Sequence, residues 1–329
     1  MSLAERLTEV VNADTALSSE RRALVRELLA RAVAVAESDA NTKDLRVAVR
    51  AIDELLEAFL LFDRFADRPK LTVFGSARTR PGHPHYELAA ELARVMAARG
   101  WIVVSGGGPG IMEAAARGGG RDATIGVNID LPFEQSPNPF IDVATMLVTM
   151  RYFFTRKVAL TRSSIAFVIL PGGLGTMDEL FEIITLLDTG KTTPAPVVLL
   201  DTPDGTYWDE WRAFVDGTLI EGGYVSAVDL NLVRPARGVD EALAEIDGFY
   251  ANYEGFTLDG SRATLHLRLP PRPEDLARLK ALVPQFDLGE GLRVEPDGTL
   301  AFDFDGRSYV ALRTVIDEVN RWVAPAPAD

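Results

Sequence analysis

Cysteine is absent from the 329-residue chain, and histidine occurs only three times. Without cysteine, neither a disulfide framework nor a thiolate metal site can form. His83 and His85 share a proline-rich loop and His266 lies far along the chain, which is a weak basis for a histidine metal site. The composition therefore points away from metalloenzymes and disulfide-rich secreted proteins, and we expect a cytoplasmic location.

Long apolar runs and an excess of basic residues are also missing. No stretch of the sequence is long and apolar enough to cross a bilayer. The formal net charge is −14, whereas binding to nucleic acid or to an anionic membrane requires a positive surface. We therefore expect neither nucleic acid nor membrane among the partners. The apolar content of 47% is ordinary for a globular protein with a sizeable core.

Two common nucleotide-binding motifs are missing as well. The chain contains neither GxGxxG nor GxxxxGK[ST], so a dinucleotide-dependent dehydrogenase and a P-loop NTPase are not expected. A serine nucleophile has little support, because neither Ser76 nor Ser105 has a histidine evidently placed as its base.

The strongest local pattern is the stretch from Ile165 to Leu187. An apolar run to Leu170 predicts a strand that is buried on both faces. Glycines at 172, 173 and 175 predict a tight turn, and Thr176 is expected to cap a helix that starts at Met177. A strand, a glycine turn and a helix N-terminus together present free N–H groups to an anion, most often a phosphate.

Strands alternate with helices on both sides of this stretch, which predicts an α/β fold with a doubly wound, Rossmann-like parallel sheet. The expected strands are Lys70–Phe74, Trp101–Ser105, Ala123–Ile129, Met146–Thr149, Ile165–Leu170, Pro196–Leu200 and Asn231–Arg234. We expect three domains: an N-terminal helical extension (1–66), a nucleotide-binding catalytic core (67–250) and a small C-terminal α+β unit (251–329).

Three of these strands end in glycine turns, at Gly75–Ser76, Gly106–Gly110 and Gly172–Gly175. In open α/β sheets ligands bind beyond the carboxyl ends of the strands, where the strand order reverses. Three such turns at one edge predict a nucleotide-sized ligand.

Charged residues near this edge offer candidate chemistry. Arg156 and Lys157 precede the fifth strand, and a guanidinium can donate to a phosphate or a base edge with two prongs. Glu179 lies one turn into the helix at the phosphate turn, where a carboxylate could accept a proton from water or stabilise an oxocarbenium-like centre. The alternatives at this point are a solvated basic pair and a carboxylate that only stabilises the helix dipole.

The motifs together resemble the Lonely Guy (LOG) family. Residues 171–179 read PGGLGTMDE and fit that family's PGGxGTxxE signature, and Arg156-Lys157 fits its RK pair. Gly75-Ser76 and residues 105–114 look like its other two glycine turns. The resemblance covers residues 70 to about 245. Members were long labelled lysine decarboxylases, a label for which these residues give no chemical support.

The resemblance implies a hydrolase of N-glycosyl bonds, a nucleotide 5′-monophosphate phosphoribohydrolase. It would release the free base and ribose 5-phosphate from AMP or a related, for example cytokinin, ribotide. By carry-over, Arg156 and Glu179 are the catalytic pair. Substrate-binding residues are Gly75, Ser76, Gly107, Gly108, Lys157, Gly172, Gly173, Gly175 and Thr176. No metal or other cofactor is implied, and a homodimer or a higher homo-oligomer is expected.

The sequence departs from the short family members in two places. Those members carry MHxRK where this chain has FFTRK at 153–157, and the segment Leu131–Ile141 resembles an insertion of the longer bacterial nucleotide-nucleosidase branch. That segment is expected to cover the substrate. Two alternatives stay open: a non-catalytic carrier of a nucleotide or of molybdenum cofactor, and a structural partner whose flanking domains do the work.

Overall fold

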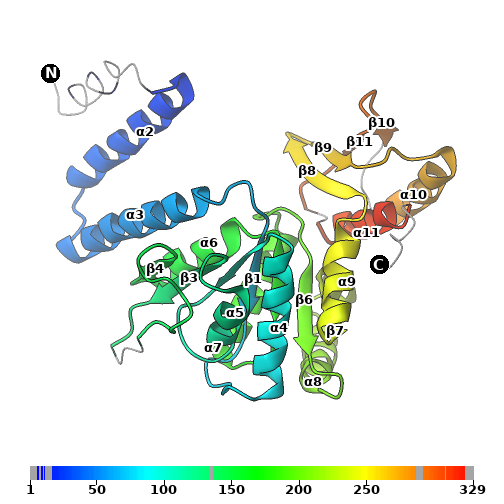
Figure 1. Ribbon diagram of the computed structural model, residues 1–329. Helices are drawn as coiled ribbons and strands as arrows, with labels where there is room; N and C mark the ends of the chain where they lie inside the picture. Colours follow the sequence, from blue (N-terminus) through cyan, green and yellow to red (C-terminus); the bar gives the residue numbers. More distant parts are fainter. Residues whose placement is uncertain are drawn as a thin grey trace. The chain divides into compact units, whose positions relative to one another are not determined.

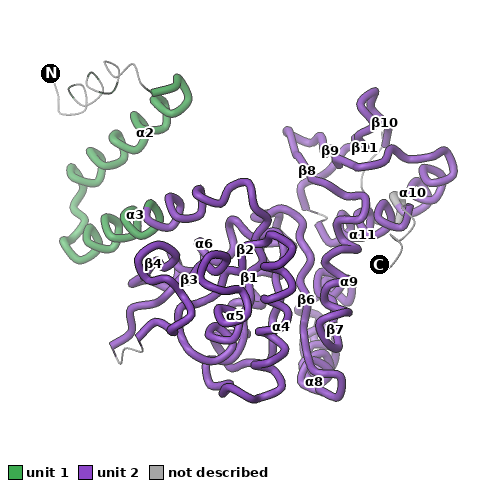
Figure 2. Tube along the Cα trace, in the orientation of Figure 1, with its two compact units in different colours: residues 1–56 green, residues 57–329 purple. Residues whose placement is uncertain are grey.

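The computed structural model describes residues 17–132, 136–286, 292–307 and 309–322, together with residues 6, 9 and 11. The chain forms two compact units, residues 1–56 and 57–329 (Figure 2). The expected division at residues 66 and 250 stays a prediction.

The first unit contains helix α2 (Ser19–Ala36) and the beginning of α3 (Thr42–Asp63). The Ser18 side chain caps α2 by accepting a hydrogen bond from the backbone N–H of Arg21 at 3.2 Å. A serine just before the first turn accepts a hydrogen bond from an N–H group that has no partner within the helix. Ser18 therefore favours a helix that begins at Ser19.

The second unit contains a seven-stranded sheet in which every pair of neighbouring strands is parallel, as the sequence predicts. The strand order is β4-β3-β2-β1-β5-β6-β7. The strands are β1 (Lys70–Phe74), β2 (Ile102–Ser105), β3 (Thr124–Ile129), β4 (Leu147–Met150), β5 (Ala166–Ile169), β6 (Val197–Asp201) and β7 (Val233–Arg237).

Helices cover both faces of this sheet (Figure 1). Successive strand side chains point to opposite faces, so Leu71 and Val73 join one core layer whereas Phe74 joins the other. The first layer is completed by α4 (Pro84–Ala98), α5 (Ile111–Gly119) and α9 (Val239–Phe249). The second layer is completed by α6 (Phe153–Arg162), α7 (Leu174–Asp188) and α8 (Tyr207–Phe214).

The strand order reverses between β1 and β5. The chain builds outward from β1 through β2, β3 and β4, then returns to β5 and builds the other half. Connections leaving β1 and β5 therefore diverge at their carboxyl ends and leave a crevice, which is where open α/β sheets bind ligands. The turn at Gly75 follows β1 directly, and the turn at Gly172 follows β5 after two residues.

The chain ends in a four-stranded antiparallel sheet of order β10-β11-β9-β8 with two helices. Its elements are β8 (Tyr253–Asp259), β9 (Arg262–Leu267), α10 (Pro273–Phe286), β10 (Arg293–Val294), β11 (Leu300–Asp303) and α11 (Tyr309–Asn320). Strands and helices occur together here, as expected for the small α+β unit that the sequence predicts. A π-helical turn (Val215–Ile220) and a 3-10 helix (Ala227–Leu232) join α8 to β7.

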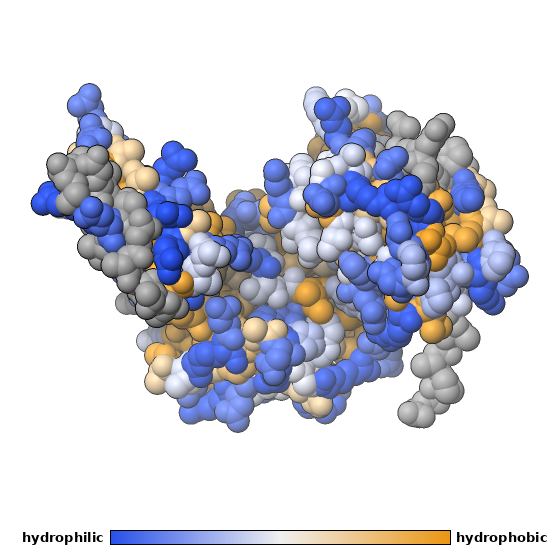
Figure 3. Space-filling model, turned by 90° about the horizontal axis from the view of Figure 1, so that it is seen from above, coloured by the Kyte–Doolittle hydropathy of each residue, from blue (hydrophilic) through white to orange (hydrophobic). Residues whose placement is uncertain are grey.

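The face drawn in Figure 3 is largely hydrophilic, and hydrophobic residues form scattered patches on it rather than one continuous surface. Across the described part of the chain, no helix has the length and apolar character needed to span a membrane.

Candidate functional site

A cavity of about 1140 Å³ lies at the carboxyl ends of β1 and β5. It brings together ten of the eleven residues that the sequence nominates. These are Gly75, Ser76, Gly108, Arg156, Lys157, Gly172, Gly173, Gly175, Thr176 and Glu179. Gly107 is not among the lining residues: its carbonyl instead accepts hydrogen bonds from Asn138, whose backbone N–H lies at 2.8 Å.

Backbone hydrogen bonds hold the three glycine turns against one another. The N–H of Ser76 donates to the carbonyl of Pro171 at 3.2 Å, and the N–H of Ile111 donates to the carbonyl of Ser76 at 3.0 Å. A Cβ at Gly75 would lie 2.7 Å from the Ile111 side chain, so a larger residue would push the first and second turns apart. The turns therefore form one assembly.

Helix α7 begins earlier than the sequence predicts. Its first residue is Leu174, its N-cap is Gly173, and no side chain caps it. The expectation that Thr176 caps the helix is therefore wrong, because Thr176 already lies in the first turn and is buried. An N-terminus without a side-chain cap leaves backbone N–H groups open to the cavity, with the positive end of the helix dipole behind them.

The glycines of the third turn serve different purposes. A Cβ at Gly172 would overlap the side chain of Thr176, so packing requires glycine there. A Cβ at Gly173 or Gly175 would meet nothing within 4 Å, and neither residue has a positive φ. Gly173 is the N-cap, a position that favours glycine over alanine, whereas Gly175 lies inside the helix, where glycine costs about 1 kcal/mol relative to alanine. A ligand that approaches the backbone closely explains Gly175.

This contrast predicts different outcomes for two alanine substitutions. Gly175→Ala should leave thermal stability unchanged or raise it by up to about 1 kcal/mol, while weakening ribose 5-phosphate binding by about tenfold or more. Gly172→Ala should lower the melting temperature, because Thr176 must move. Calorimetric binding and thermal unfolding of both variants check this. Unchanged affinity in Gly175→Ala would remove the ligand explanation.

Arg156 from α6 and Glu179 from α7 form an ion pair on the cavity wall. Their Nη1 and Oε1 atoms are 3.3 Å apart, and the two side chains are only 12% and 16% exposed. The Nε of Arg156 also donates to the carbonyl of Val127 at the end of β3, at 2.9 Å. Gly106 leaves room for the guanidinium, since a Cβ there would collide with it. Contacts with residues of α6, α7 and β3 therefore hold the ion pair in place.

Burial dominates the electrostatics of this pair. It raises the pKa of the Glu179 carboxyl to about 7, although the Arg156 guanidinium opposes the rise. Burial likewise lowers the pKa of the Arg156 guanidinium, and Glu179 opposes that change. A carboxylate whose pKa lies near neutrality is suited to accept and return a proton at physiological pH.

Lys157 lines the same cavity, but its ammonium is already engaged. It lies 2.9 Å from Asp178 and 2.9 Å from Glu182, both on α7. In this arrangement Lys157 fastens α6 to α7 beside the catalytic candidates. Its nomination as a substrate-binding residue stays a prediction.

Asn128 and His85 are among the polar residues of the cavity wall that the sequence-based reasoning did not nominate. Asn128, at the carboxyl end of β3, is 7% exposed, and a Cβ on Gly107 would touch it. His85 lies near the start of α4. Asn128 could have been recognised in the sequence as a polar residue near the end of a buried strand.

Leu131 and Pro132 also line the cavity, whereas residues 133–135 of the segment expected to cover the substrate lie outside the described residues.

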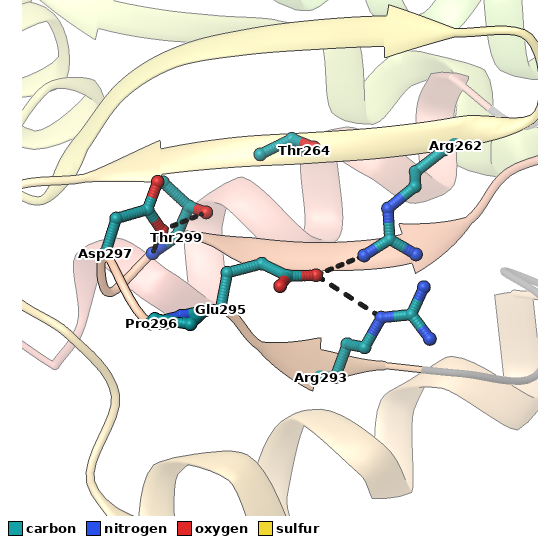
Figure 4. Close-up of a pocket in the computed structure, with 7 residues that line it drawn as sticks. All are labelled: Arg262, Thr264, Arg293, Glu295, Pro296, Asp297 and Thr299. Carbon is teal, nitrogen blue, oxygen red and sulfur yellow. Dashed lines mark hydrogen bonds and ion pairs between the residues drawn. The ribbon is translucent and has the colours of Figure 1, made fainter.

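A second cavity lies on the C-terminal antiparallel sheet (Figure 4). There Arg262 and Arg293 both pair with the carboxylate of Glu295, the latter at 3.3 Å. Thr299 donates to Asp297 in the adjoining turn at 2.7 Å. These charges satisfy one another, and no glycine turn or helix N-terminus lines the cavity. The switch-point cavity is therefore the candidate active site. No group of three or more potential metal-binding side chains occurs among the described residues.

Comparisons with known proteins find relatives that match about half of the chain. A family model described as possible lysine decarboxylase matches residues 95–246, which include Arg156 and Glu179. The chain is 37% identical over 162 residues to the cytokinin riboside 5′-monophosphate phosphoribohydrolase of Mycobacterium tuberculosis, covering 48% of this chain and 82% of that protein. It is 34% identical over 185 residues to the protein of the same name from Mycobacterium marinum, covering 54% of this chain and 95% of that one.

Among solved structures, a molybdenum cofactor carrier protein from Chlamydomonas reinhardtii aligns with 25% identity. The alignment covers 54% of this chain and 94% of that chain, with a TM-score of 0.38. A likeness at this level does not decide between a carrier and an enzyme.

Proposed function

This chain belongs to the LOG family, and from that premise we propose that it is a nucleoside 5′-monophosphate phosphoribohydrolase. It hydrolyses the N-glycosidic bond of AMP or a related, for example cytokinin, ribotide to the free base and ribose 5-phosphate. The observation that carries the proposal is the buried Arg156–Glu179 pair beside an uncapped helix N-terminus at the switch point of the sheet.

In the proposed reaction the phosphate binds the free N–H groups at the start of α7, with the Gly75–Ser76 turn on its other side. The phosphate then places the ribose toward Glu179. The bond from C1′ to the base nitrogen breaks, and the oxygen of a water molecule bonds to C1′. One proton of that water passes to Glu179, and the departing base takes up a proton from solvent. The ionised Glu179 also stabilises positive charge developing on the ribose.

The alternative, a carrier that binds a nucleotide or molybdenum cofactor without turnover, does not require this carboxylate. A carboxylate near a phosphate site repels the ligand, and burying it raises its pKa to about 7. Incubation with a panel of nucleoside monophosphates, with detection of free base and ribose 5-phosphate, tests the proposal. Tight ligand binding without release of base from any substrate would support the carrier instead.

We further propose that the protein acts in the cytoplasm as a homodimer. Phe153, Phe154 and Leu174 are exposed, although all three are large and apolar, and Phe153 and Leu174 also line the cavity. A second copy that covers them would shield the mouth of the site from water. Light scattering after size-exclusion chromatography should give twice the mass of one chain, and a single-chain mass would contradict this assembly.

The pKa of Glu179 predicts the pH dependence of the reaction. A general base acts only when ionised, so kcat/KM should rise with pH and level off above about 7. Below about pH 6 it should fall about tenfold per pH unit. A pH–rate profile for AMP with a non-interacting buffer series checks this. A profile that is flat between pH 5 and 8 would contradict the role of Glu179 as base.

A further inference from the structure

His85 lies between a buried carboxylate and the cavity. Its Nε2 is 2.8 Å from Oδ1 of Asp201, the last residue of β6. Asp201 is 1% exposed and does not line the cavity, whereas His85 does. The buried carboxylate of Asp201 therefore holds the imidazole of His85 in place at the cavity wall.

The other contacts of Asp201 indicate which ring nitrogen of His85 donates to it. Its oxygens accept hydrogen bonds from the backbone N–H groups of Thr202 at 2.8 Å and Tyr207 at 3.2 Å. The guanidinium of Arg237 lies 3.8 Å from the same carboxylate. All of these partners are donors, so we assign the Nε2–H of His85 as a donor to Asp201 as well. Within the described residues Nδ1 has no hydrogen-bond partner, and it is the ring atom available to a ligand.

The same carboxylate also supports the third glycine turn. Tyr207, whose N–H is bound by Asp201, donates its hydroxyl to the carbonyl of Gly172 at 2.6 Å. Gly205 leaves room for this arrangement, because a Cβ there would collide with the Asp201 carboxylate. One buried group thus sets the position of His85 and of the turn proposed to bind phosphate.

The charged residues of the cavity wall favour an anionic ligand near His85. Arg156 and Lys157, from α6, are neutralised by carboxylates of α7. Arg78, in the loop between β1 and α4, lines the cavity and pairs with no carboxylate among the described residues. His85 follows in the same segment. The positive charge that remains available to a ligand therefore lies beside the glycine turns.

We propose that His85, with both ring nitrogens protonated when phosphate is bound, donates from Nδ1 to the 5′-phosphate of the substrate, and that Asp201 is its positioning residue. The proposal rests on the proposed function for the identity of the substrate, but phosphate binding tests it without turnover. A charge-assisted hydrogen bond contributes about 1.5–3 kcal/mol, which corresponds to about 10- to 100-fold in affinity.

The first test is His85→Gln. The amide of the glutamine can still donate to Asp201 but cannot carry a charge. Calorimetry should show about 10- to 100-fold weaker ribose 5-phosphate binding, with adenosine binding unchanged. For AMP, KM should rise while kcat changes little. His266→Gln is the matched control, because His266 lies on β9 of the other sheet. Equal ribose 5-phosphate affinity in wild type and His85→Gln would overturn the proposal.

A double-mutant comparison of Asp201 and His85 tests the role of Asp201. Asp201→Asn should weaken ribose 5-phosphate binding more in the wild-type background than in the His85→Gln background, where only its support of the Gly172 turn can still be lost. A purely structural role would give equal losses in both backgrounds. If Asp201→Asn does not fold, His85→Asn, which loses the bond to Asp201, replaces it and should bind no better than His85→Gln.

The outcomes separate the two proposals. If wild type hydrolyses AMP and His85→Gln has the same KM, only the assignment of His85 fails. If wild type binds ribose 5-phosphate but releases base from no monophosphate, the hydrolase proposal fails. The binding comparison then still decides the assignment of His85.

Discussion

Glu179→Gln is expected to reduce kcat for AMP by about 10²- to 10⁴-fold, the usual contribution of a general base. Glutamine has nearly the same shape but cannot accept a proton from water or stabilise positive charge on the ribose. Affinity for ribose 5-phosphate should stay within a few-fold of wild type, because the substitution changes none of the groups proposed to bind the phosphate. Single-turnover kinetics and calorimetry measure the two quantities separately.

The matched control for this variant is Asp188→Asn. Asp188 is the last residue of the same helix, at the end away from the cavity. Its replacement removes one carboxylate from α7 without touching the site, so kcat should not change. Full activity of Glu179→Gln would show that the chemistry lies elsewhere in the cavity.

The glycine turns and the strands that precede them could be predicted from the sequence, because both are local patterns. A buried strand such as Ala166–Ile169 is an unbroken apolar run, and the turn that follows needs small residues. The start of α7 was placed at Met177 because glycine disfavours helix. The structure starts it at Leu174, where the free N–H groups of the first turn face a cavity.

The parts of the site that the sequence did not reveal depend on the order of strands in the sheet. Val127 and Arg156 meet because β3 and α6 pack against each other, although they are 29 residues apart. His85 and Asp201 are 116 residues apart. Nothing local marks such pairs. The family resemblance named Arg156 and Glu179, but only the structure shows that they form a buried pair and that Lys157 is engaged by two carboxylates.

Arg156→Met is expected to have the second-largest effect, lowering kcat/KM for AMP by about 10²- to 10³-fold at pH 7. Methionine fills most of the space but removes the charge and the bond to the Val127 carbonyl. Without the guanidinium, the pKa of Glu179 should rise above about 7, so the pH–rate profile should move to higher pH. Arg162→Met is the control, because Arg162 lies at the other end of α6 and stacks on Phe59.

The stability of Arg156→Met should depend on pH in a direction that the pKa of Glu179 fixes. A carboxyl with a pKa of about 7 when folded and 4.5 when unfolded stabilises the fold fully only below about pH 4.5. That contribution is lost as pH rises through about 7. In wild type Arg156 limits the loss, whereas in Arg156→Met an ionised Glu179 would be buried without its partner. Melting temperatures of variant and wild type should therefore nearly agree at pH 5 and diverge by pH 8. A constant difference would mean that the two side chains are not coupled.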